Sequence, residues 1–484
     1  MSAQQPITPD HTADQQEAAV TPDQLTDMLM SILSDGLDHP EVWDEIPAFL
    51  EVFPDLADII AQRLALESQP TAQVLLDLLR AIALANGGAL EEAFALIEPA
   101  ALKNSQSPLV QGALFRLKAL REPDNPAYQL EGTFCSVPFR QMDVLENTTH
   151  LCCASWLQAS AGNMQTAHWQ DVSNSKAAQD IRASIHDGSY RYCNKTACPK
   201  IAGRDLPTKA EAAQESTKWA RILIDRETAV QEGPETVNLA YDRTCNLACP
   251  SCRSEKFAAD SKMRERFAVM QDNNILPLLK DAETVFVTGS GDPFASKNFR
   301  KLMKDLTPED YPKLGFQIMT NAMLLTRKQW AEFPTLHGRT RLMKVSIDAA
   351  TGPTHEKLRL GAKWPVMLEN MAFAGELAAK GDVDLFELVF VVQQDNYREM
   401  GDAVDLAKEV GAQQIYFARI TNWGTFSTVQ FAQKSVFTPS HPEYADFIAA
   451  MQDERLLDPI VMLGDLREFV GMEIPRVRDV LAVA

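Results

Sequence analysis

The sequence has few basic residues, few cysteines and no long apolar run. Lysine and arginine number 46 against 66 aspartates and glutamates among 484 residues, a formal net charge of −20. Binding to phosphate backbones or to anionic lipid depends on clustered basic side chains, so we expect neither nucleic acid nor a membrane as a partner. No run approaches the roughly 18 apolar residues that cross a bilayer. The first 20 residues lack a basic start and an apolar segment, so we expect no signal peptide and a cytoplasmic protein.

The shortage of basic residues is concentrated at one end of the chain. Residues 1–100 contain 18 acidic and two basic side chains, whereas residues 101–484 contain 48 acidic and 44 basic ones. The larger part of the chain is therefore nearly neutral, which leaves anionic substrates open as candidates. The acidic N-terminal region is either a solvated face that keeps the protein soluble or a docking surface for a basic protein partner.

Eight cysteines are too few for a disulfide scaffold in a chain of this length. They are also unevenly placed, because all of them lie between Cys135 and Cys252. In a reducing compartment, clustered cysteines indicate metal or redox chemistry rather than crosslinks.

The pattern of residues changes several times along the first half of the chain. Residues 1–20 are polar and are predicted to be disordered. Residues 21–125 carry apolar side chains at helical spacing, interrupted by proline and glycine, which predicts an acidic all-helical domain with tetratricopeptide-like hairpins. Residues 131–204 contain five cysteines and many turn formers, which suggests a small domain organised around a metal. A charged, helix-prone connector follows at 205–232.

Between residues 235 and 430, six β-rich runs alternate with helix-prone segments. This alternation predicts an α/β fold with a parallel sheet and right-handed crossovers. Ligands bind such sheets at the carboxyl ends of the strands. Residues 431–484 are predicted to form a mixed C-terminal extension. The predicted strands are 235–242, 283–291, 314–322, 342–349, 384–392 and 413–420, and the predicted helices are 254–280, 296–306, 325–333, 364–380 and 397–411.

A C-x3-C-x2-C motif, formed by Cys245, Cys249 and Cys252, follows the first of these strands. Three thiolates at this spacing can bind three corners of a [4Fe-4S] cluster, which normally takes four cysteines, so one iron is left open for a small-molecule ligand. Zinc is the alternative, but a structural zinc site needs a fourth ligand, and no further Cys or His is nearby in the sequence.

In this strand–loop–helix context the sequence resembles the radical S-adenosylmethionine (SAM) enzymes, and the resemblance covers about residues 131–430. It implies a partial (β/α)6 barrel, similar to a TIM barrel, and a [4Fe-4S] cluster whose open iron is chelated by SAM. It also implies reductive cleavage of SAM to a 5′-deoxyadenosyl radical that abstracts hydrogen from a substrate. The electron would come from a donor of the flavodoxin or ferredoxin type.

Residues at the ends of the later strands match SAM-contact positions of that family. The second strand ends in a glycine-rich turn, which holds the SAM amino group in the family, and the third ends in Thr320-Asn321-Ala322, with alanine where the family has glycine. Ser251 replaces an aromatic residue that often packs near the adenine, so adenine packing must come from elsewhere. The resemblance implies the following SAM contacts: Gly289, Gly291, Asp292, Ser346 at the ribose, Arg359 at the carboxylate, and Gln393.

Some of these residues have an alternative structural interpretation. Ser346 and Asp348 could cap a strand end, and Arg359 could be a surface charge on a helix. Gln393 and Asn396 could be turn formers. We assign no catalytic side chain from the sequence.

The five upstream cysteines resemble the SPASM/twitch module, which carries auxiliary iron–sulfur clusters in peptide-modifying radical SAM enzymes. The family usually places this module after the barrel, whereas here it precedes it. The resemblance implies one auxiliary [4Fe-4S] cluster, and a four-cysteine zinc site is the alternative. The implied ligands are Cys135, Cys152, Cys193 and Cys198, with Cys153 as the alternative to Cys152.

The choice within the Cys152–Cys153 pair can be argued from the turn before it, where the family has a glycine five residues ahead of its cysteine. That position is Asn147 for Cys152 and Thr148 for Cys153. Asparagine tolerates the left-handed backbone conformation far better than a β-branched residue, which favours Cys152.

The resulting functional prediction is a radical SAM enzyme acting on a peptide or protein. The first alternative is modification of a small molecule or of a glycan or nucleotide-sugar intermediate. The second is a non-catalytic iron–sulfur protein for electron transfer.

Overall fold

A computed structural model describes residues 70–472, except 105–106 and 126–127, together with Ile46, Leu50 and Ile59. The segment predicted to be disordered, 1–20, lies outside the described residues, as do most of residues 21–69 and the last part of the predicted C-terminal extension, 473–484. The chain divides into two compact units, Met1–Gln129 with Asn194–Thr196, and Leu130–Cys193 with Ala197–Ala484.

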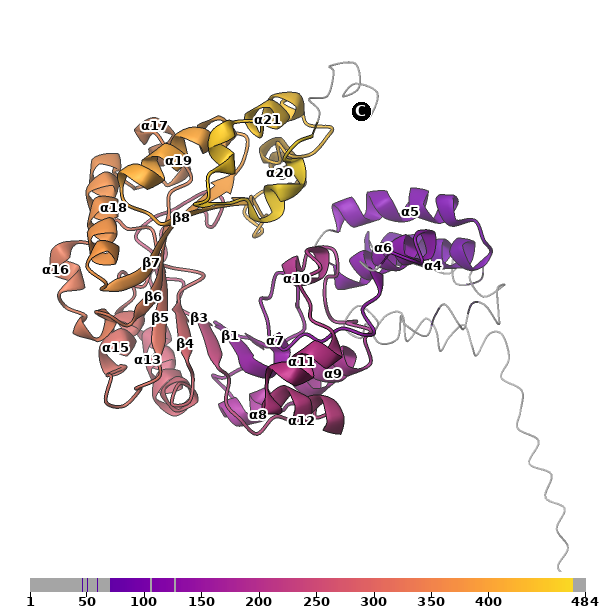
Figure 1. Ribbon diagram of the computed structural model, residues 1–484, viewed down its shortest axis with the longest axis horizontal. Coiled ribbons are helices and arrows are strands. Elements are labelled where there is room, and N and C mark those ends of the chain that lie inside the picture. Colours follow the sequence, from indigo (N-terminus) through magenta and orange to yellow (C-terminus); the bar gives the residue numbers. More distant parts are fainter. Residues whose placement is uncertain are drawn as a thin grey trace, which may run out of the picture. The chain divides into compact units, whose positions relative to one another are not determined.

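The first unit is helical in its described part. Its helices are α4 (Pro70–Asn86), α5 (Leu90–Lys103) and α6 (Pro108–Arg121) (Figure 1). They pack through a buried cluster that includes Leu78, Leu79, Phe94 and Ile97. The helical spacing of 21–125 thus corresponds to three helices in its described part, and the similarity to tetratricopeptide hairpins stays a prediction.

The second unit is α/β, as predicted. Its described strands form one nine-stranded sheet in the order β2-β1-β3-β4-β5-β6-β7-β8-β9, in which only β1 and β2 pair antiparallel. The strands are β1 (Gln141–Leu145), β2 (Thr149–His150), β3 (Thr236–Ala240), β4 (Thr284–Val287), β5 (Gly315–Thr320), β6 (Thr340–Ser346), β7 (Val383–Val392), β8 (Gln414–Arg419) and β9 (Val461–Met462).

Strands β3 to β8 are the six that the sequence predicts. Strand β1 comes from the cysteine-rich segment and pairs in parallel with β3, so that Met142 lies beside Val237 and Asp143 beside Asn238. The cysteine-rich segment is therefore continuous with the main sheet. Its strand could not be expected from local pattern, because it is short and its partner is far away in the sequence.

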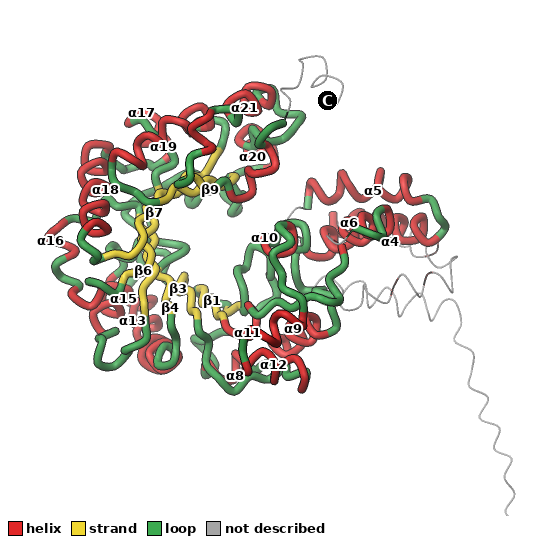
Figure 2. The backbone as a smooth tube through the Cα atoms, viewed as in Figure 1, coloured by secondary structure: helices red, strands yellow, loops and turns green. Residues whose placement is uncertain are grey.

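The helices that follow the strands lie along the outer side of the sheet (Figure 1). Figure 2 shows the strands as a bent sheet with these helices on its outside. The helices between β3 and β8 are α13 (Ser261–Met270), the π-helical turn η2 (Gln271–Ile275), α14 (Leu276–Leu278), α15 (Lys297–Asp305), α16 (Arg327–Trp330), η3 (Pro334–Leu336), α17 (Gly352–Leu358), α18 (Trp364–Ala379), η4 (Tyr397–Glu399) and α19 (Met400–Glu409).

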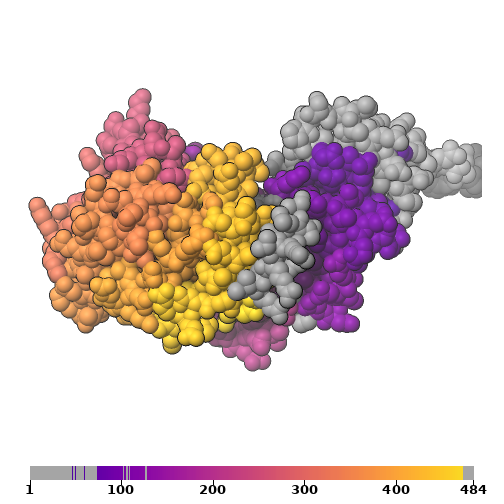
Figure 3. All heavy atoms as spheres, turned by 90° about the horizontal axis from the view of Figure 1, so that it is seen from above, coloured from indigo at the N-terminus to yellow at the C-terminus, as the bar shows by residue number. Residues whose placement is uncertain are grey.

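Two further groups of helices flank this core. Those before β3 come from the cysteine-rich segment and the connector that follows it, and those after β8 precede and follow β9. In the space-filling view the orange and yellow atoms of the C-terminal half form one continuous surface (Figure 3). The flanking helices are α7 (Val137–Arg140), α8 (Trp169–Ser173), α9 (Lys176–His186), α10 (Pro199–Ala202), α11 (Lys209–Glu215), α12 (Thr217–Asp225), α20 (Thr428–Lys434), α21 (Tyr444–Ala450), η5 (Glu454–Leu457) and η6 (Gly464–Phe469).

The first long helix begins later than the sequence suggests. A helix is expected from residue 254, but α13 begins at Ser261, after the cap Asp260, whose carboxylate accepts a hydrogen bond from the Met263 amide at 2.8 Å. The residues before Asp260 do not join the helix, because one of them, Phe257, pairs with the cysteine loop instead. Its carbonyl accepts a hydrogen bond from the Cys245 amide at 2.9 Å. Residues 254–259 thus serve to hold the cysteine loop.

The strands alternate between two environments. Val237, Val285, Ile318, Val345 and Leu388 are fully buried, and burial of each such side chain contributes about 1.5–3 kcal/mol. Their neighbours along each strand, on the opposite face, are mostly half-buried. Among the described residues, no helix has the length and apolar character needed to cross a membrane.

Candidate functional site

The Cys245–Cys252 loop begins just past the carboxyl end of β3. Its two ends are fixed by the backbone. The Cys245 amide donates to the Phe257 carbonyl at 2.9 Å, and the Cys249 carbonyl accepts from the amides of Cys252 and Arg253, each at 2.9 Å. Cys252 is exposed, whereas Cys245 and Cys249 are half-buried. The three thiols thus share one short, tethered loop at the end of the sheet where ligands bind in parallel α/β folds.

Polar side chains donate to two of the three sulfurs. Nη2 of Arg253 lies 3.3 Å from the Cys252 sulfur, and Nδ2 of Asn321 lies 3.6 Å from the Cys245 sulfur. Asn321 follows β5 and also donates to Oδ1 of Asn246 at 2.9 Å. A neutral thiol is a weak acceptor, whereas a sulfur that carries negative charge gains more from such donors.

Burial raises the pKa of the Cys245 thiol, and it raises the pKa of the Cys249 thiol to about 11. Arg359 opposes this increase at Cys249, while Asp348 and the two other thiols of the loop add to it. A thiol of this kind loses its proton when a metal binds, so metal binding at this loop would release protons.

The glycine-rich turn after β4 packs directly on the cysteine loop. A Cβ at Gly291 would lie 2.6 Å from the Thr244 carbonyl oxygen and 2.8 Å from that of Asp242, so only glycine fits there. At Gly289 the nearest atoms to a Cβ would be 3.8 Å away. The fold of the chain therefore requires glycine at 291, but its own packing does not require glycine at 289.

Asp292 is fully buried and engaged on both carboxylate oxygens. Oδ2 accepts from Thr320 Oγ1 at 2.7 Å and from the Asn321 amide at 2.9 Å, and Oδ1 accepts from the Phe294 amide at 3.1 Å. Its own amide donates to the Thr244 carbonyl at 2.9 Å. Burial raises the pKa of this carboxyl group, which these hydrogen bonds oppose. Asp292 thus links the turn after β4 to the end of β5.

Arg359 follows α17 and forms an ion pair with Asp348, with 2.8 Å between Nη2 and Oδ2. Both side chains are buried, and Nε of Arg359 has no hydrogen-bond partner within the described residues. Burial acts to lower the pKa of Arg359, but the charges of Asp348 and Cys249 outweigh it and raise that pKa. The interpretation of Arg359 as a surface charge is therefore wrong, because the residue is 9 % exposed.

Ser346 and Gln393 lie at the ends of β6 and β7. Ser346 is half-buried, and its hydroxyl forms no hydrogen bond within the described part of the chain. Gln393 is 2 % exposed, and its backbone amide donates to Asn396 Oδ1 at 2.8 Å. Nδ2 of Asn396 donates to the carbonyls of Asp348 and Val391, so Asn396 holds the turn.

The two donors to the cysteine sulfurs are not predicted by the sequence pattern. The sequence analysis predicts no role for Arg253, although this residue directly follows Cys252. It names Asn321 only as part of the Thr320-Asn321-Ala322 motif. Adjacency to the third cysteine was a usable signal for Arg253. Asn321 could not be paired with Cys245 from the sequence, because only the parallel order β3-β4-β5 brings the ends of β3 and β5 to the same edge.

The upstream cysteines come from separate segments. Cys135 precedes α7, Cys152 and Cys153 follow β2, and Cys198 is the N-cap of α10. Burial raises the pKa of Cys135 to about 11, with a further contribution from Cys198. Within the described ranges, no three His, Cys, Asp or Glu side chains form a group that could hold a metal ion.

Cys152 and Cys153 differ in their surroundings. Burial raises the pKa of Cys152 well above the usual value, and Cys135 and Cys193 add to the increase. The indole Nε1 of Trp156 donates to the Cys152 sulfur at 3.2 Å. Burial also raises the pKa of Cys153, which is hydrogen-bonded to Ser155. Of the two, Cys152 thus receives the hydrogen bond from an aromatic donor.

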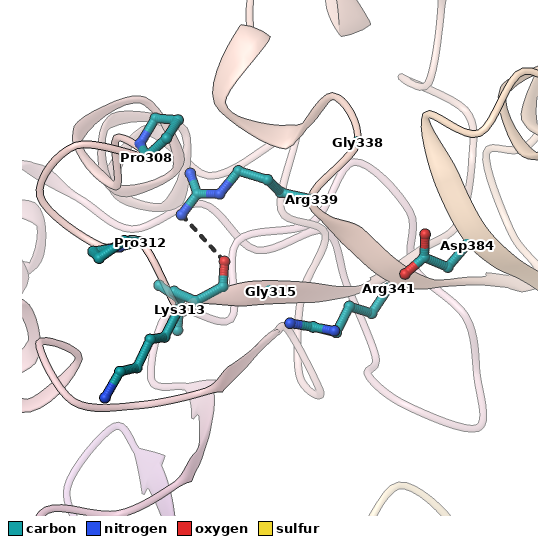
Figure 4. Close-up of a pocket in the computed structure, with 9 residues that line it drawn as sticks. Pro308, Pro312, Lys313, Gly315, Gly338, Arg339, Arg341 and Asp384 are labelled. Carbon is teal, nitrogen blue, oxygen red and sulfur yellow. Dashed lines mark hydrogen bonds between the residues drawn. The ribbon is translucent and has the colours of Figure 1, made fainter.

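A hollow of about 350 Å³ lies at the other end of the sheet, where β5, β6 and β7 begin (Figure 4). Arg339 lines it and donates to the carbonyls of Leu306, Tyr311 and Leu314. Figure 4 draws one hydrogen bond of Arg339 as a dashed line. Since the cysteine loop leaves the carboxyl end of β3, this hollow is separate from the candidate site.

Comparisons with known proteins gave no match to a family model and none to a curated protein. Among solved structures, the chain is similar to SuiB of Streptococcus suis bound to S-adenosylmethionine, with 14 % identity over 60 % of this chain and 61 % of that chain, and a TM-score of 0.34. It is also similar to SuiB bound to the precursor peptide SuiA, with 14 % identity over 53 % of this chain and 56 % of that chain, and a TM-score of 0.30.

A third similar structure is a histidine-tagged anSMEcpe with bound AdoMet, with 19 % identity over 47 % of this chain and 63 % of that chain, and a TM-score of 0.34. The chain thus matches less than two thirds of the length of each of these proteins. With TM-scores below 0.5, these similarities do not assign a function to this chain.

Proposed function

We propose that this chain is a radical SAM enzyme. The observation that carries the proposal is the Cys245–Cys249–Cys252 loop at the carboxyl end of β3, packed against a turn whose Gly291 has no room for a side chain. The partial (β/α)6 barrel that this assignment requires would be formed by β3 to β8 and their helices.

The types and spacing of the loop residues fit a [4Fe-4S] cluster, but their side chains do not form a metal-holding group among the described residues, so the three thiols would have to converge when the cluster binds. Cys245, Cys249 and Cys252 would hold three of its irons, and the donors Arg253 and Asn321 are placed to stabilise negative charge on the sulfurs. The side-chain oxygen Oδ1 of Asn238 adds support at the neighbouring turn. This buried acceptor has no partner among the described residues, and it lies 3.8 Å from the Cβ position of Gly289. An amino group of SAM at this turn would bring a donor to a region that lacks one.

The SAM-contact residues proposed from the sequence have different support. Gly289 leaves space for a ligand, Arg359 keeps an unpaired Nε beside the loop, and Ser346 and Gln393 lie at neighbouring strand ends. We propose that these four residues and Gly291 contact SAM. For Asp292 we propose an indirect contribution, because both of its carboxylate oxygens already accept hydrogen bonds that fix the turn.

When bound, the cluster supplies the electron that cleaves SAM into methionine and a 5′-deoxyadenosyl radical. The chain's own residues would bind SAM and orient it. Asp348 holds the Arg359 guanidinium at 2.8 Å, so the cation is already ordered before a carboxylate binds. The buried strand residues beneath the loop keep water from that side of the site.

We also propose an auxiliary [4Fe-4S] cluster held by Cys135, Cys152, Cys193 and Cys198. Two relations support this set. The charges of Cys135 and Cys193 both act on Cys152, and that of Cys198 acts on Cys135. The Trp156 hydrogen bond favours Cys152 over Cys153 as the ligand. Zinc remains the competing metal to be tested.

For the substrate we propose a peptide or protein, supported by the resemblance of residues 131–204 to the SPASM/twitch module. A flavodoxin- or ferredoxin-type protein would supply the electron, and the acidic N-terminal region would be the place for a further protein partner. A small-molecule or glycan substrate is the second candidate. A short precursor peptide encoded beside this gene favours the first, and sugar-pathway genes favour the second.

The test of the core proposal needs no substrate. Full-length protein reconstituted with iron and sulfide without oxygen, reduced with dithionite and given SAM, is expected to release 5′-deoxyadenosine and methionine. Cys249→Ala should abolish this release, and Ser254→Ala, an exposed position on the same segment, should not. Unchanged release from Cys249→Ala would refute the assignment.

The auxiliary site is tested by counting metal. A variant in which Cys245, Cys249 and Cys252 are all alanine is expected to retain about four irons per chain. Zinc in place of iron would refute the auxiliary cluster.

A further inference from the structure

Arg253 is a buried cation beside an exposed cysteine. Cys252 is exposed, yet Arg253, the next residue, is 7 % exposed. A charged side chain is costly to bury unless polar or charged partners compensate it. The partners of Arg253 therefore indicate why the side chain turns inward.

The guanidinium of Arg253 joins three separate segments. Nη1 donates to the Arg243 carbonyl at 2.6 Å, before the cysteine triplet. Nη2 donates to the Ser290 carbonyl at 2.6 Å, within the turn after β4, and to the Cys252 sulfur at 3.3 Å. The planar fork of arginine allows these contacts at once, which a lysine could not reproduce.

No carboxylate within the described part of the chain forms an ion pair with Arg253. The group beside it that can take up negative charge is the Cys252 sulfur, 3.3 Å from Nη2. If the cysteines of the loop bind a metal as thiolates, the guanidinium would therefore lie directly against negative charge.

We propose that Arg253 is a positioning residue that raises the reduction potential of the cluster held by Cys245, Cys249 and Cys252 and fixes the Gly289–Gly291 turn against the cysteine loop. The inference rests on the proposed function. An added electron makes the cluster and its thiolates more negative, so a nearby buried cation stabilises the reduced form more than the oxidised form. The hydrogen bond to the Ser290 carbonyl has a separate effect, because it acts on the turn proposed to bind SAM.

Two substitutions separate these effects. Arg253→Gln removes the charge and most of the fork, whereas Arg253→Lys keeps the charge and loses the fork. Lys256→Gln is the matched control, since it removes a positive charge from the same segment at an exposed position that has no contact with a cysteine sulfur.

The experiment is a redox titration of the full-length, reconstituted proteins, followed by electron paramagnetic resonance. The loop cluster is identified as the signal that changes when SAM is added, which separates it from an auxiliary cluster. Arg253→Gln is expected to lower the ratio of reduced to oxidised loop cluster about tenfold at a fixed potential, equivalent to about 59 mV for one electron. Arg253→Lys and Lys256→Gln should titrate like the wild type, and Arg253→Lys should bind SAM about tenfold more weakly.

The outcomes distinguish the inference from the proposed function. A wild-type protein that binds no iron–sulfur cluster, or whose cluster does not respond to SAM, refutes the proposed function. A wild-type cluster that responds to SAM, with the same potential in Arg253→Gln, overturns only the inference. If Arg253→Gln fails to retain iron, the Arg253→Lys variant decides. A wild-type reduction potential with weaker SAM binding supports the inference, and a reduction potential shifted by about 59 mV overturns it.

Discussion

The two groups of cysteines in this chain are assembled in different ways. Cys245, Cys249 and Cys252 lie on one loop, and their spacing in the sequence alone brings them together. The upstream set comes from segments spread over residues 135–198, and the fold has to collect it. The loop also leaves Cys252 exposed, whereas Cys193 and Cys198 are buried. The two groups thus differ most at Cys252, which is exposed, and at Cys193 and Cys198, which are buried, while Cys135, Cys152, Cys245 and Cys249 are all half-buried.

The electrostatic surroundings of the two groups differ as well. The loop thiols face the buried cations Arg253 and Arg359. The Cys152–Cys153 pair faces the carboxylate of Asp143, which lies on β1 and accepts from Asn238 Nδ2 at 3.0 Å. Positive charge favours thiolate and added electrons, and negative charge opposes both. The contrast is limited to these contacts, because Asp292 and Asp348 also act on Cys245 and Cys249, and Lys200 acts on Cys135 and Cys198.

The largest expected difference concerns SAM cleavage in the absence of substrate. Cys245→Ala should abolish it, because an open [4Fe-4S] site cannot lose one of its three protein ligands and still hold SAM. Cys198→Ala should leave it at the wild-type level while about four irons are lost. The measurement is 5′-deoxyadenosine release together with iron content, and loss of cleavage in both variants would show that the two groups do not act separately.

The next difference is between two glycines of one turn. Gly291→Ala places a methyl group against the carbonyls of Thr244 and Asp242, which should cost about 1–3 kcal/mol of folding free energy and weaken cluster retention. Gly289→Ala meets only ordinary contacts, so it should fold like the wild type and bind SAM more weakly. Urea unfolding and SAM titration measure the two effects. Equal stability of both variants would contradict the close packing of the turn on the loop.

Within the upstream group, the Cys152–Cys153 pair provides a finer test. Cys152→Ser should lose the auxiliary irons, and Cys153→Ser should keep them, because Cys152 is coupled to Cys135 and Cys193 and receives the Trp156 hydrogen bond. Iron analysis of the two variants decides the matter. Full iron in Cys152→Ser and loss in Cys153→Ser would reverse the assignment.

The smallest expected effect is a pH dependence of stability in the half of the site near Arg359. Burial, with a contribution from Arg359, lowers the pKa of His355 from 6.5 to about 4. The unfolded chain then binds a proton that the folded chain does not, so His355 makes folding less favourable as the pH falls from 6.5 toward 4. Between pH 7 and 5.5 this amounts to about 1 kcal/mol.

His355→Phe should remove this share of the pH dependence. Urea unfolding at both pH values, compared with the wild type, gives the size of the effect. Burial also lowers the pKa of His150 in the upstream region, so part of the pH dependence should remain in the variant. An identical loss of stability in variant and wild type would contradict a neutral, buried His355.

Local pattern was enough to predict strands β3 to β8, because each is a short β-rich run followed by a helix-prone segment. It was also enough for the cysteine triplet. It failed for β1, whose partner β3 is far away in the sequence, and for the start of α13, because Phe257 is held by the Cys245 amide. The motif after β4 predicts Asp292 as a SAM contact, but the structure uses both of its carboxylate oxygens to join two strand ends.

The sequence by itself determined the alternation of strands and helices and the spacing of Cys245, Cys249 and Cys252, since both depend on residues close together in the chain. Only the tertiary structure decided which side chains face those cysteines. Asn321 reaches Cys245 because β3, β4 and β5 are adjacent and parallel, and Arg253 turns inward because the Ser290 carbonyl of the next turn accepts a hydrogen bond from its guanidinium. Such contacts depend on strand order, which no local pattern specifies.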